Sequence, residues 1–234
     1  MNKLIPIIIS AIAIALVVGI GFPSYYAQVV EVQELRDKAL SIPKAERQLL
    51  NLGHSSPVLG STNAQITIVE FGDYQCTYCK KFFSETVESI LINYVETGKV
   101  KMLFKDFIVV DGAIGGNDSM NAANAAHCAN DQGMFWQFHS TLYNNWAGEG
   151  TGWVSSEQLN KFANTLELDM NEFSNCVSDL KWKKLVNASH DDAIALGVTA
   201  TPTFFVIDEN RNVLKITGAQ HYDCLLYTSP SPRD

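Results

Sequence analysis

Two cysteines separated by two residues stand where a predicted strand gives way to a predicted helix. Residues 65–71 (QITIVEF) are apolar and rich in β-branched side chains, which predicts a buried strand. The helix is expected to begin at Cys76, to run through KKFFSETVESILINYVETG and to end at Gly98. A C-x-x-C pair in this setting, Cys76 and Cys79, is typical of a redox-active dithiol.

The helix start predicts unequal reactivity for the two thiols. Backbone N–H groups in the first turn have no partner within the helix, and the positive end of the helix dipole lies beside them. Both effects favour a thiolate at Cys76 and lower its pKa. Cys79 lies one turn further along, so we expect it to be more buried and less reactive.

The order of the other predicted elements indicates an α/β fold with a helical insertion. Further strands are expected at residues 100–110 (VKMLFKDFIVV), 203–208 (TFFVID) and 212–217 (NVLKIT). The last two are joined by a hairpin-type connection. Residues 119–196 contain helical patterns and no convincing strand. Within this block, Ser155–Gln158 and Asp169–Glu172 have the spacing of capping boxes, which predicts two helix starts.

Three stretches of sequence carry a family resemblance. They are VEFGDYQCTYC around the cysteine pair, GVTATPTFFV further along and CANDQGMFWQFH in the helical block. Together they resemble the DsbA-like branch of the thioredoxin superfamily, over about residues 57–223. The resemblance implies a thioredoxin-like α/β domain with a helical insertion at about 119–196. It also implies a protein-disulfide oxidoreductase whose redox group is the dithiol itself, with no organic cofactor and no metal.

The resemblance assigns roles to five residues. Cys76 matches the attacking cysteine and Cys79 the resolving one. Pro202, preceded by Thr201, matches a cis-proline whose loop faces the active disulfide. Glu70, six residues before the first cysteine, matches a buried acid beneath the disulfide. Such a carboxyl, with a raised pKa, could accept the proton of the resolving thiol during exchange.

Other interpretations of these residues stay open from the sequence. The family's dipeptide between the cysteines usually contains a histidine, whereas this chain has Thr77-Tyr78, so the family's redox potential cannot be transferred. Glu70 could be a surface charge on an edge strand, and Pro202 an ordinary trans proline at a strand entry. Cys76 and Cys79 could form half of a zinc site, although the sequence has no second C-x-x-C.

The beginning of the chain predicts a membrane segment. Leu4–Phe22 is almost wholly apolar and follows Lys3, a pattern that suits a membrane-spanning helix with its positive flank in the cytoplasm. We expect residues 1–27 to be an uncleaved anchor, followed by a stalk over residues 28–56, because Tyr25–Ala27 is a poor cleavage site. The alternative is a cleaved signal peptide, which would give a secreted or periplasmic protein. Both place the domain on the extracytoplasmic side.

The last eleven residues affect how many cysteines belong to the fold. Cys224–Asp234 resembles one translated reading frame of a common transposase sequencing adapter, and we expect it to lie outside the fold. Four of the five cysteines then remain. Taken singly, Cys128 and Cys176 would be read as small buried hydrophobes. In an oxidising compartment the even count favours a structural disulfide between them.

The net charge and the family resemblance together indicate which classes of partner the protein has. With 25 Asp and Glu against 17 Lys and Arg, the net charge of −8 argues against a nucleic-acid surface. The resemblance implies exchange with cysteines of exported proteins and a separate redox partner, which could itself lie in the membrane; the direction of exchange stays open. Two alternatives are a copper(I) metallochaperone that holds its metal with Cys76 and Cys79, and a non-catalytic binding module of the same fold.

Overall fold

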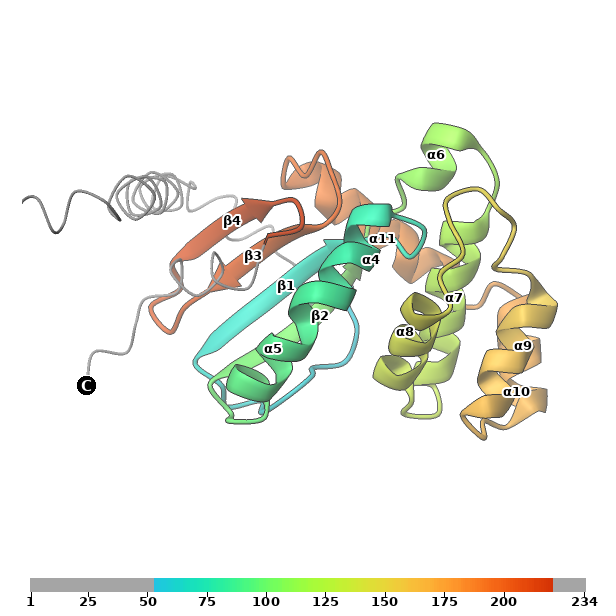
Figure 1. Ribbon diagram of the computed structural model, residues 1–234, viewed down its shortest axis with the longest axis horizontal. Helices are drawn as coiled ribbons and strands as arrows, with labels where there is room; N and C mark the ends of the chain where they lie inside the picture. The colour runs from blue at the N-terminus through green and yellow to red at the C-terminus, as the bar shows by residue number, and fades with distance from the viewer. Residues whose placement is uncertain (1–52, 221–234) are drawn as a thin grey trace, which may run out of the picture.

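The computed structural model describes residues 53–220, which contain a mixed four-stranded sheet on one side and a group of helices on the other (Figure 1). The strand order is β2-β1-β3-β4. β1 pairs in parallel with β2 and antiparallel with β3, and β3 pairs antiparallel with β4. The strands are β1 (Ile66–Gly72), β2 (Val100–Asp106), β3 (Thr203–Ile207) and β4 (Val213–Thr217). The thioredoxin-like α/β architecture with a helical insertion is therefore confirmed.

Helices pack against the sheet and form a group beside it (Figure 1). A turn follows β1, and from Thr77 the chain is helical as far as Val95. The order is α4 (Thr77–Phe82), the π-helical turn η1 (Phe83–Val87), α5 (Glu88–Ile90) and a second π-helical turn η2 (Leu91–Val95). The helices between β2 and β3 are α6 (Val110–Ile114), α7 (Asp118–Asn130), α8 (Phe135–Asn144), α9 (Ser156–Thr165), α10 (Met170–Ser178) and α11 (Lys183–Ala195).

Alternation along β1 decides which side chains face which helix. Ile68 packs with Phe82 of α4 in one buried cluster, whereas Val69 packs with Ala193 of α11 in another. Successive side chains of a strand point to opposite faces, so Glu70 shares the face of Ile68. The strand therefore directs this carboxyl toward the helix that carries the cysteine pair.

The strand expected at 100–110 is shorter, and this part of the prediction is wrong. β2 ends at Asp106, and α6 begins at Val110, the last residue of the segment expected to be strand. The carboxylate of Asp73, at the end of β1, accepts hydrogen bonds from the backbone N–H groups of Val109 and Val110 at 2.9 and 3.0 Å. These bonds draw the apolar segment FIVV away from the sheet edge, which its composition could not reveal.

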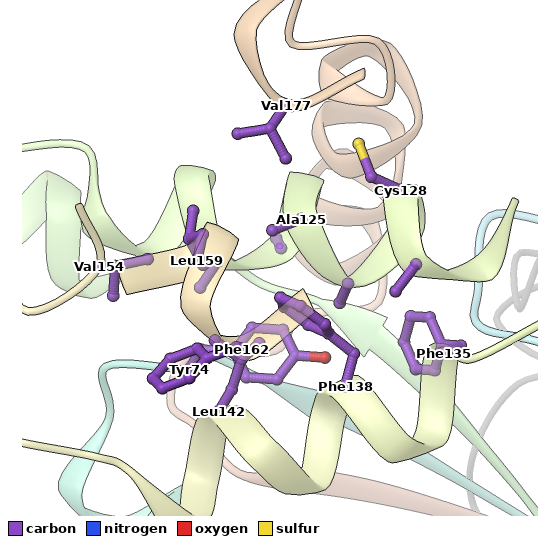
Figure 2. Close-up of a cluster of buried hydrophobic side chains, with 14 of the residues drawn as sticks. Tyr74, Ala125, Cys128, Phe135, Phe138, Leu142, Val154, Leu159, Phe162 and Val177 are labelled. Atoms are coloured by element: carbon purple, nitrogen blue, oxygen red, sulfur yellow. The ribbon is translucent and has the colours of Figure 1, made fainter. Parts of the chain in front are cut away.

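The helical insertion has its own apolar core, which reaches the cysteine pair. Phe138, Leu142 and Phe162 pack there with Tyr74 (Figure 2), and the same cluster includes both Cys76 and Cys79. The insertion therefore forms one wall of the region around the cysteines.

Both predicted helix starts in the insertion are confirmed. The Ser155 side chain accepts a hydrogen bond from the backbone N–H of Gln158, at the start of α9. Asp169 accepts from Asn171 and Glu172 at the start of α10. Each acceptor satisfies an N–H group that would otherwise lack a partner at the helix end.

The predicted membrane segment at 1–27, most of the stalk at 28–56 and the terminal stretch Cys224–Asp234 lie outside the described residues. Within residues 53–220, no helix combines the length and the apolar character needed to cross a bilayer. Ser56, at the end of the predicted stalk, is already part of the fold, because its N–H donates to the carbonyl oxygen of Phe104 at 2.8 Å.

Candidate active site

Cys76 occupies the position just before the first turn of α4, with extended backbone angles (φ −63°, ψ 123°). A tight turn leads into it: its N–H donates to the carbonyl oxygen of Asp73 at 3.0 Å. The Asp73 carboxylate also accepts a hydrogen bond from the N–H of Gln75 at 2.9 Å, in addition to those from the N–H groups of Val109 and Val110. One buried carboxylate thus shapes the turn that presents the cysteine.

The two thiols differ in burial and in acidity. Both are reduced in this structure; Cys76 is 6% exposed and Cys79 is fully buried. The pKa of Cys76 is lowered to about 6, chiefly by a hydrogen bond from the Cys79 thiol and against the effect of burial. Burial raises the pKa of Cys79 well above its usual value, and its contacts with Cys76 and the charge of Glu70 add to this. Cys76 is therefore the thiol that ionises near neutral pH.

The loop before β3 contacts the reactive sulfur. The Thr201–Pro202 peptide bond is cis. The Cys76 thiol donates to the backbone carbonyl oxygen of Thr201 at 3.4 Å, while the Thr201 side chain helps to lower the pKa of that thiol. The fold thus brings together three of the residues that the sequence singled out, from segments far apart in the chain.

Glu70 is 5% exposed beneath the active-site helix. Its pKa is raised to about 8, first by burial and then by the negative charge of Cys76. The carboxyl also lines a groove of about 750 Å³ whose other lining residues include Phe83 of η1 and His139 of α8. The groove is open to solvent, so the buried acid lies at the wall of a solvent-accessible space.

The sequence did not single out the aromatic groups around this acid. The Tyr74 hydroxyl and His139 Nδ1 lie 3.0 Å apart in a hydrogen bond. Burial lowers the pKa of His139 to about 3, so its imidazole is neutral, and burial raises the pKa of Tyr74 well above its usual value. His139 directly follows an aromatic run that reads as insertion core, and no local signal separates it from that core.

A second missed feature is a loop between α8 and α9 that contacts the residues on both sides of Cys76. Trp146 Nε1 donates to the carbonyl oxygen of Gln75 at 2.8 Å, and the Gln75 side chain accepts from the N–H of Gly150 at 2.8 Å. Glu149 in the same loop contacts Thr77. The loop is rich in glycine and has no periodicity, so nothing in the sequence pointed to these contacts.

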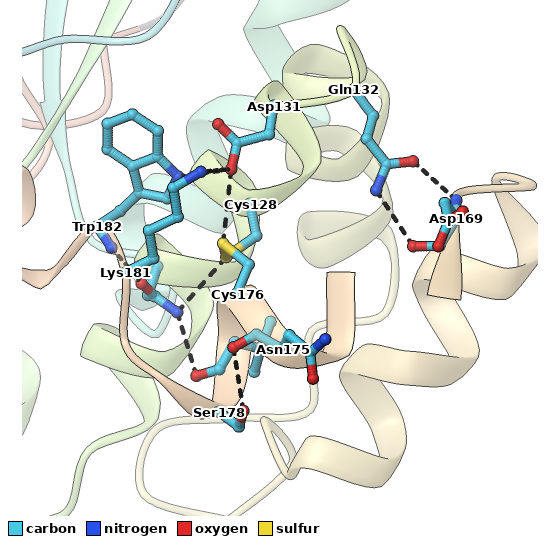
Figure 3. Close-up of a disulfide and its surroundings, with 11 residues drawn as sticks. Cys128, Asp131, Gln132, Asp169, Asn175, Cys176, Ser178, Lys181 and Trp182 are labelled. Atoms are coloured by element: carbon cyan, nitrogen blue, oxygen red, sulfur yellow. Dashed lines mark hydrogen bonds and ion pairs between the residues drawn. A yellow bond between two sulfur atoms is a disulfide. The ribbon is translucent and has the colours of Figure 1, made fainter. Parts of the chain in front are cut away.

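Cys128 and Cys176 form a disulfide with an S–S distance of 2.03 Å, which joins α7 to α10 (Figure 3). Asp131 lies beside it and accepts from Lys181 and from the Trp182 indole at 2.8 and 3.1 Å. The disulfide belongs to the helical insertion and shares no hydrogen bond with the reduced pair Cys76 and Cys79 among those of the described residues.

Comparison with known proteins agrees with this geometry. A family model described as Thioredoxin matches residues 53–221. Disulfide bond formation protein D of Bacillus subtilis (strain 168) is 30% identical over 156 residues, which cover 65% of this chain and 68% of that protein. The crystal structure of oxidised BdbD from Bacillus subtilis superimposes with a TM-score of 0.66 at 27% identity, over 76% of this chain and 92% of that one. Wolbachia pipientis α-DsbA1 shares the fold, with a TM-score of 0.67 at 23% identity over 77% and 92% of the two chains.

Proposed function

This chain is a DsbA-like protein-disulfide oxidoreductase of the thioredoxin family, and from that premise we propose that it exchanges disulfides with cysteines of exported proteins on the extracytoplasmic side of the membrane. In this proposal Cys76 is the attacking cysteine and Cys79 the resolving one. Thr201 and Pro202 form the loop against which the substrate disulfide is held.

One feature of the structure carries the proposal: the two thiols of the pair differ in burial and in acidity. The pKa of Cys76 is about 6, whereas burial holds the pKa of Cys79 well above its usual value. Thiol–disulfide exchange requires a thiolate as nucleophile and is faster when the leaving thiolate is the more acidic one. Cys76 satisfies the first condition as an attacking thiolate and the second as the leaving group when a mixed disulfide is resolved. Cys79 is fully buried, so the mixed disulfide would form at the more accessible Cys76 sulfur.

In the oxidative direction the reaction starts from the Cys76–Cys79 disulfide. A substrate thiolate attacks the Cys76 sulfur, which forms the mixed disulfide and releases Cys79 as a thiolate that takes up a proton. The second substrate thiolate then attacks the substrate sulfur of the mixed disulfide. A substrate disulfide forms and the Cys76 thiolate leaves, so that two electrons pass from the substrate dithiol to the protein.

Glu70 is proposed to carry the proton of Cys79 during exchange. With a pKa near 8, the carboxyl is protonated through much of the neutral range and can give up or accept a proton there. It lies on the face of β1 that packs against α4, and the groove that it lines connects it with solvent. Burial raises the pKa of Glu70 toward the range of a thiol, which lowers the cost of passing a proton between Cys79 and this carboxyl.

The extracytoplasmic location rests on two features. Leu4–Phe22 is long and apolar enough to act as an anchor or a signal peptide. The disulfide between Cys128 and Cys176 is of a kind that persists in oxidising compartments. A separate redox partner would have to restore the Cys76–Cys79 pair to its starting state after each cycle.

The proposal is tested by trapping mixed disulfides in cells that export the full chain. With Cys79→Ser the mixed disulfide at Cys76 cannot be resolved internally, so we expect adducts with exported proteins on non-reducing gels. Cys76→Ser should trap few or none, and Cys76→Ser/Cys79→Ser serves as the blank. Trapping mainly through Cys79, or equal adducts from all three variants, would contradict the assignment.

A further inference from the structure

The carboxylate of Glu149 lies at the start of the active-site helix. Its Oε1 atom accepts hydrogen bonds from the backbone N–H and from the hydroxyl of Thr77, both at 2.9 Å. The two residues are 72 positions apart in sequence. Thr77 directly follows Cys76, so the carboxylate and the reactive sulfur share the first turn of α4.

The loop that carries Glu149 is held in place on the other side of the cysteine as well. Gln75, which directly precedes Cys76, is 1% exposed and bonded to both Trp146 and Gly150 of that loop. The loop is thus anchored to the residue before the nucleophile and to the residue after it. The backbone at Glu149 is therefore held near the helix start, and its exposed carboxylate is bonded there to Thr77.

Two anions compete for the same helix end. Unpaired N–H groups and the helix dipole favour negative charge at the start of α4. The Cys76 thiolate uses this environment through the N–H groups of Tyr78 and Cys79. The N–H of Thr77 is bonded to Glu149 instead, and the carboxylate adds a negative charge of its own.

Two other ionisable groups act on the Cys76 sulfur, one from α4 and one from β1. Cys79, on the same helix, donates to Cys76 and stabilises its thiolate. Glu70, on β1, interacts with Cys76 through charge repulsion when both are ionised. Thr77 and Tyr78 supply no cation to balance these carboxylates.

We propose that Glu149 is a positioning residue that disfavours the Cys76 thiolate and thereby makes the Cys76–Cys79 disulfide a weaker oxidant. A disulfide oxidises strongly when its reduced form is stabilised, so a nearby carboxylate that destabilises the thiolate acts in the opposite direction. The helical insertion thus adjusts the redox equilibrium of the sheet domain through one loop. This inference rests on the proposed exchange activity of the pair.

The test is the equilibrium with glutathione, in which one protein disulfide and two glutathione thiols give the protein dithiol and one glutathione disulfide. Glu149→Gln keeps an oxygen acceptor for Thr77 and removes the charge. We expect the equilibrium constant for reduction to rise about two- to five-fold at low salt. Glu149→Lys, which reverses the charge, should shift it further. Added salt should diminish both differences because the carboxylate is exposed to solvent.

The matched control is Glu209→Gln, which removes one exposed carboxylate from the turn between β3 and β4. It should leave the equilibrium constant unchanged. An unchanged or lowered constant in both Glu149 variants, with thermal unfolding like that of the unmodified protein, would overturn the inference. An unmodified protein that forms no mixed disulfide with glutathione would instead contradict the proposed exchange activity, so the two failures can be told apart.

Discussion

The Cys76 thiol donates a hydrogen bond to the backbone carbonyl oxygen of Thr201, 3.4 Å away, across a sequence separation of 125 residues. The side chain of Thr201 also helps to lower the pKa of this thiol. The residue before the cis-proline therefore affects the acidity of the Cys76 thiol.

Replacing Thr201 with Val should raise the pKa of Cys76 above its value of about 6, because the side-chain hydroxyl that favours the thiolate is removed. The ultraviolet absorbance of the thiolate, titrated against pH in the reduced protein, measures this directly. Thr217→Val, on the exposed end of β4, is the control. A pKa that stays the same in Thr201→Val would remove this residue from the account of thiolate stability.

Two substitutions of Cys79 should differ in their effect on Cys76. The largest cause of its lowered pKa is the hydrogen bond from the Cys79 thiol. Cys79→Ser keeps a hydroxyl donor at this position, whereas Cys79→Ala has none. We expect the pKa of Cys76 to stay low in the first variant and to rise toward the ordinary cysteine value of about 8.5 in the second. Equal values in the two variants would show that the helix start alone sets the acidity.

Glu70→Gln should change how stability depends on pH. The pKa of Glu70 is raised from 4.5 to about 8 in the folded protein, so folding favours the neutral carboxyl. The stability contributed by this group is complete below pH 4.5 and is lost as pH rises through about 8. The variant should therefore gain free energy of unfolding relative to the unmodified protein between pH 5 and pH 8. Urea unfolding of both reduced proteins at the two pH values measures the difference; a constant difference would contradict the raised pKa.

The same substitution should slow the resolution of mixed disulfides. An amide cannot accept the proton of Cys79, so formation of its thiolate has to rely on solvent. Loss of a positioned proton acceptor costs typically 10²- to 10⁴-fold in rate. Rapid quenching with an alkylating agent follows the decay of a mixed disulfide between Cys76 and glutathione. An unaltered decay rate would mean that the proton leaves Cys79 by another route.

Removal of the second disulfide should affect stability and leave exchange intact. Cys128 and Cys176 close a loop with a sequence separation of 48 residues, for which the chain-entropy model gives about 4 kcal/mol at most. We expect Cys128→Ala/Cys176→Ala to lower the free energy of unfolding by up to this amount. Its equilibrium with glutathione should not change. Peptide mapping without reductant checks the pairing in the unmodified protein.

Much of the fold follows from local patterns in the sequence. The apolar run around Ile68 predicts a buried strand, whereas the face on which Glu70 lies follows only from the packing of that strand against α4. Ser155 and Asp169 mark their helix starts because a capping side chain bonds to backbone two or three residues away. The placement of Cys76 at a helix start has the same origin. Each of these features depends on neighbours within one turn or one strand.

Lys105 illustrates what such patterns miss. The sequence patterns assign it no role, yet its side chain is fully buried in β2 and its Nζ atom lies 2.8 Å from a carboxylate oxygen of Asp192 in α11. Only the packing of α11 across the sheet provides that partner, and a buried lysine is tolerated when it is paired.

The sequence by itself predicted the reactive pair, the strand and helix that hold it, and the family to which the chain belongs. Tertiary structure decided what surrounds the pair: the carbonyl of Thr201 at the sulfur, the path from Glu70 to solvent, and the carboxylate of Glu149 at Thr77. Local patterns depend on side chains a few residues apart, because the geometry of a helix or a strand repeats over that distance. The charges and dipoles that set the acidity of Cys76 come from segments that meet only when the whole chain has folded.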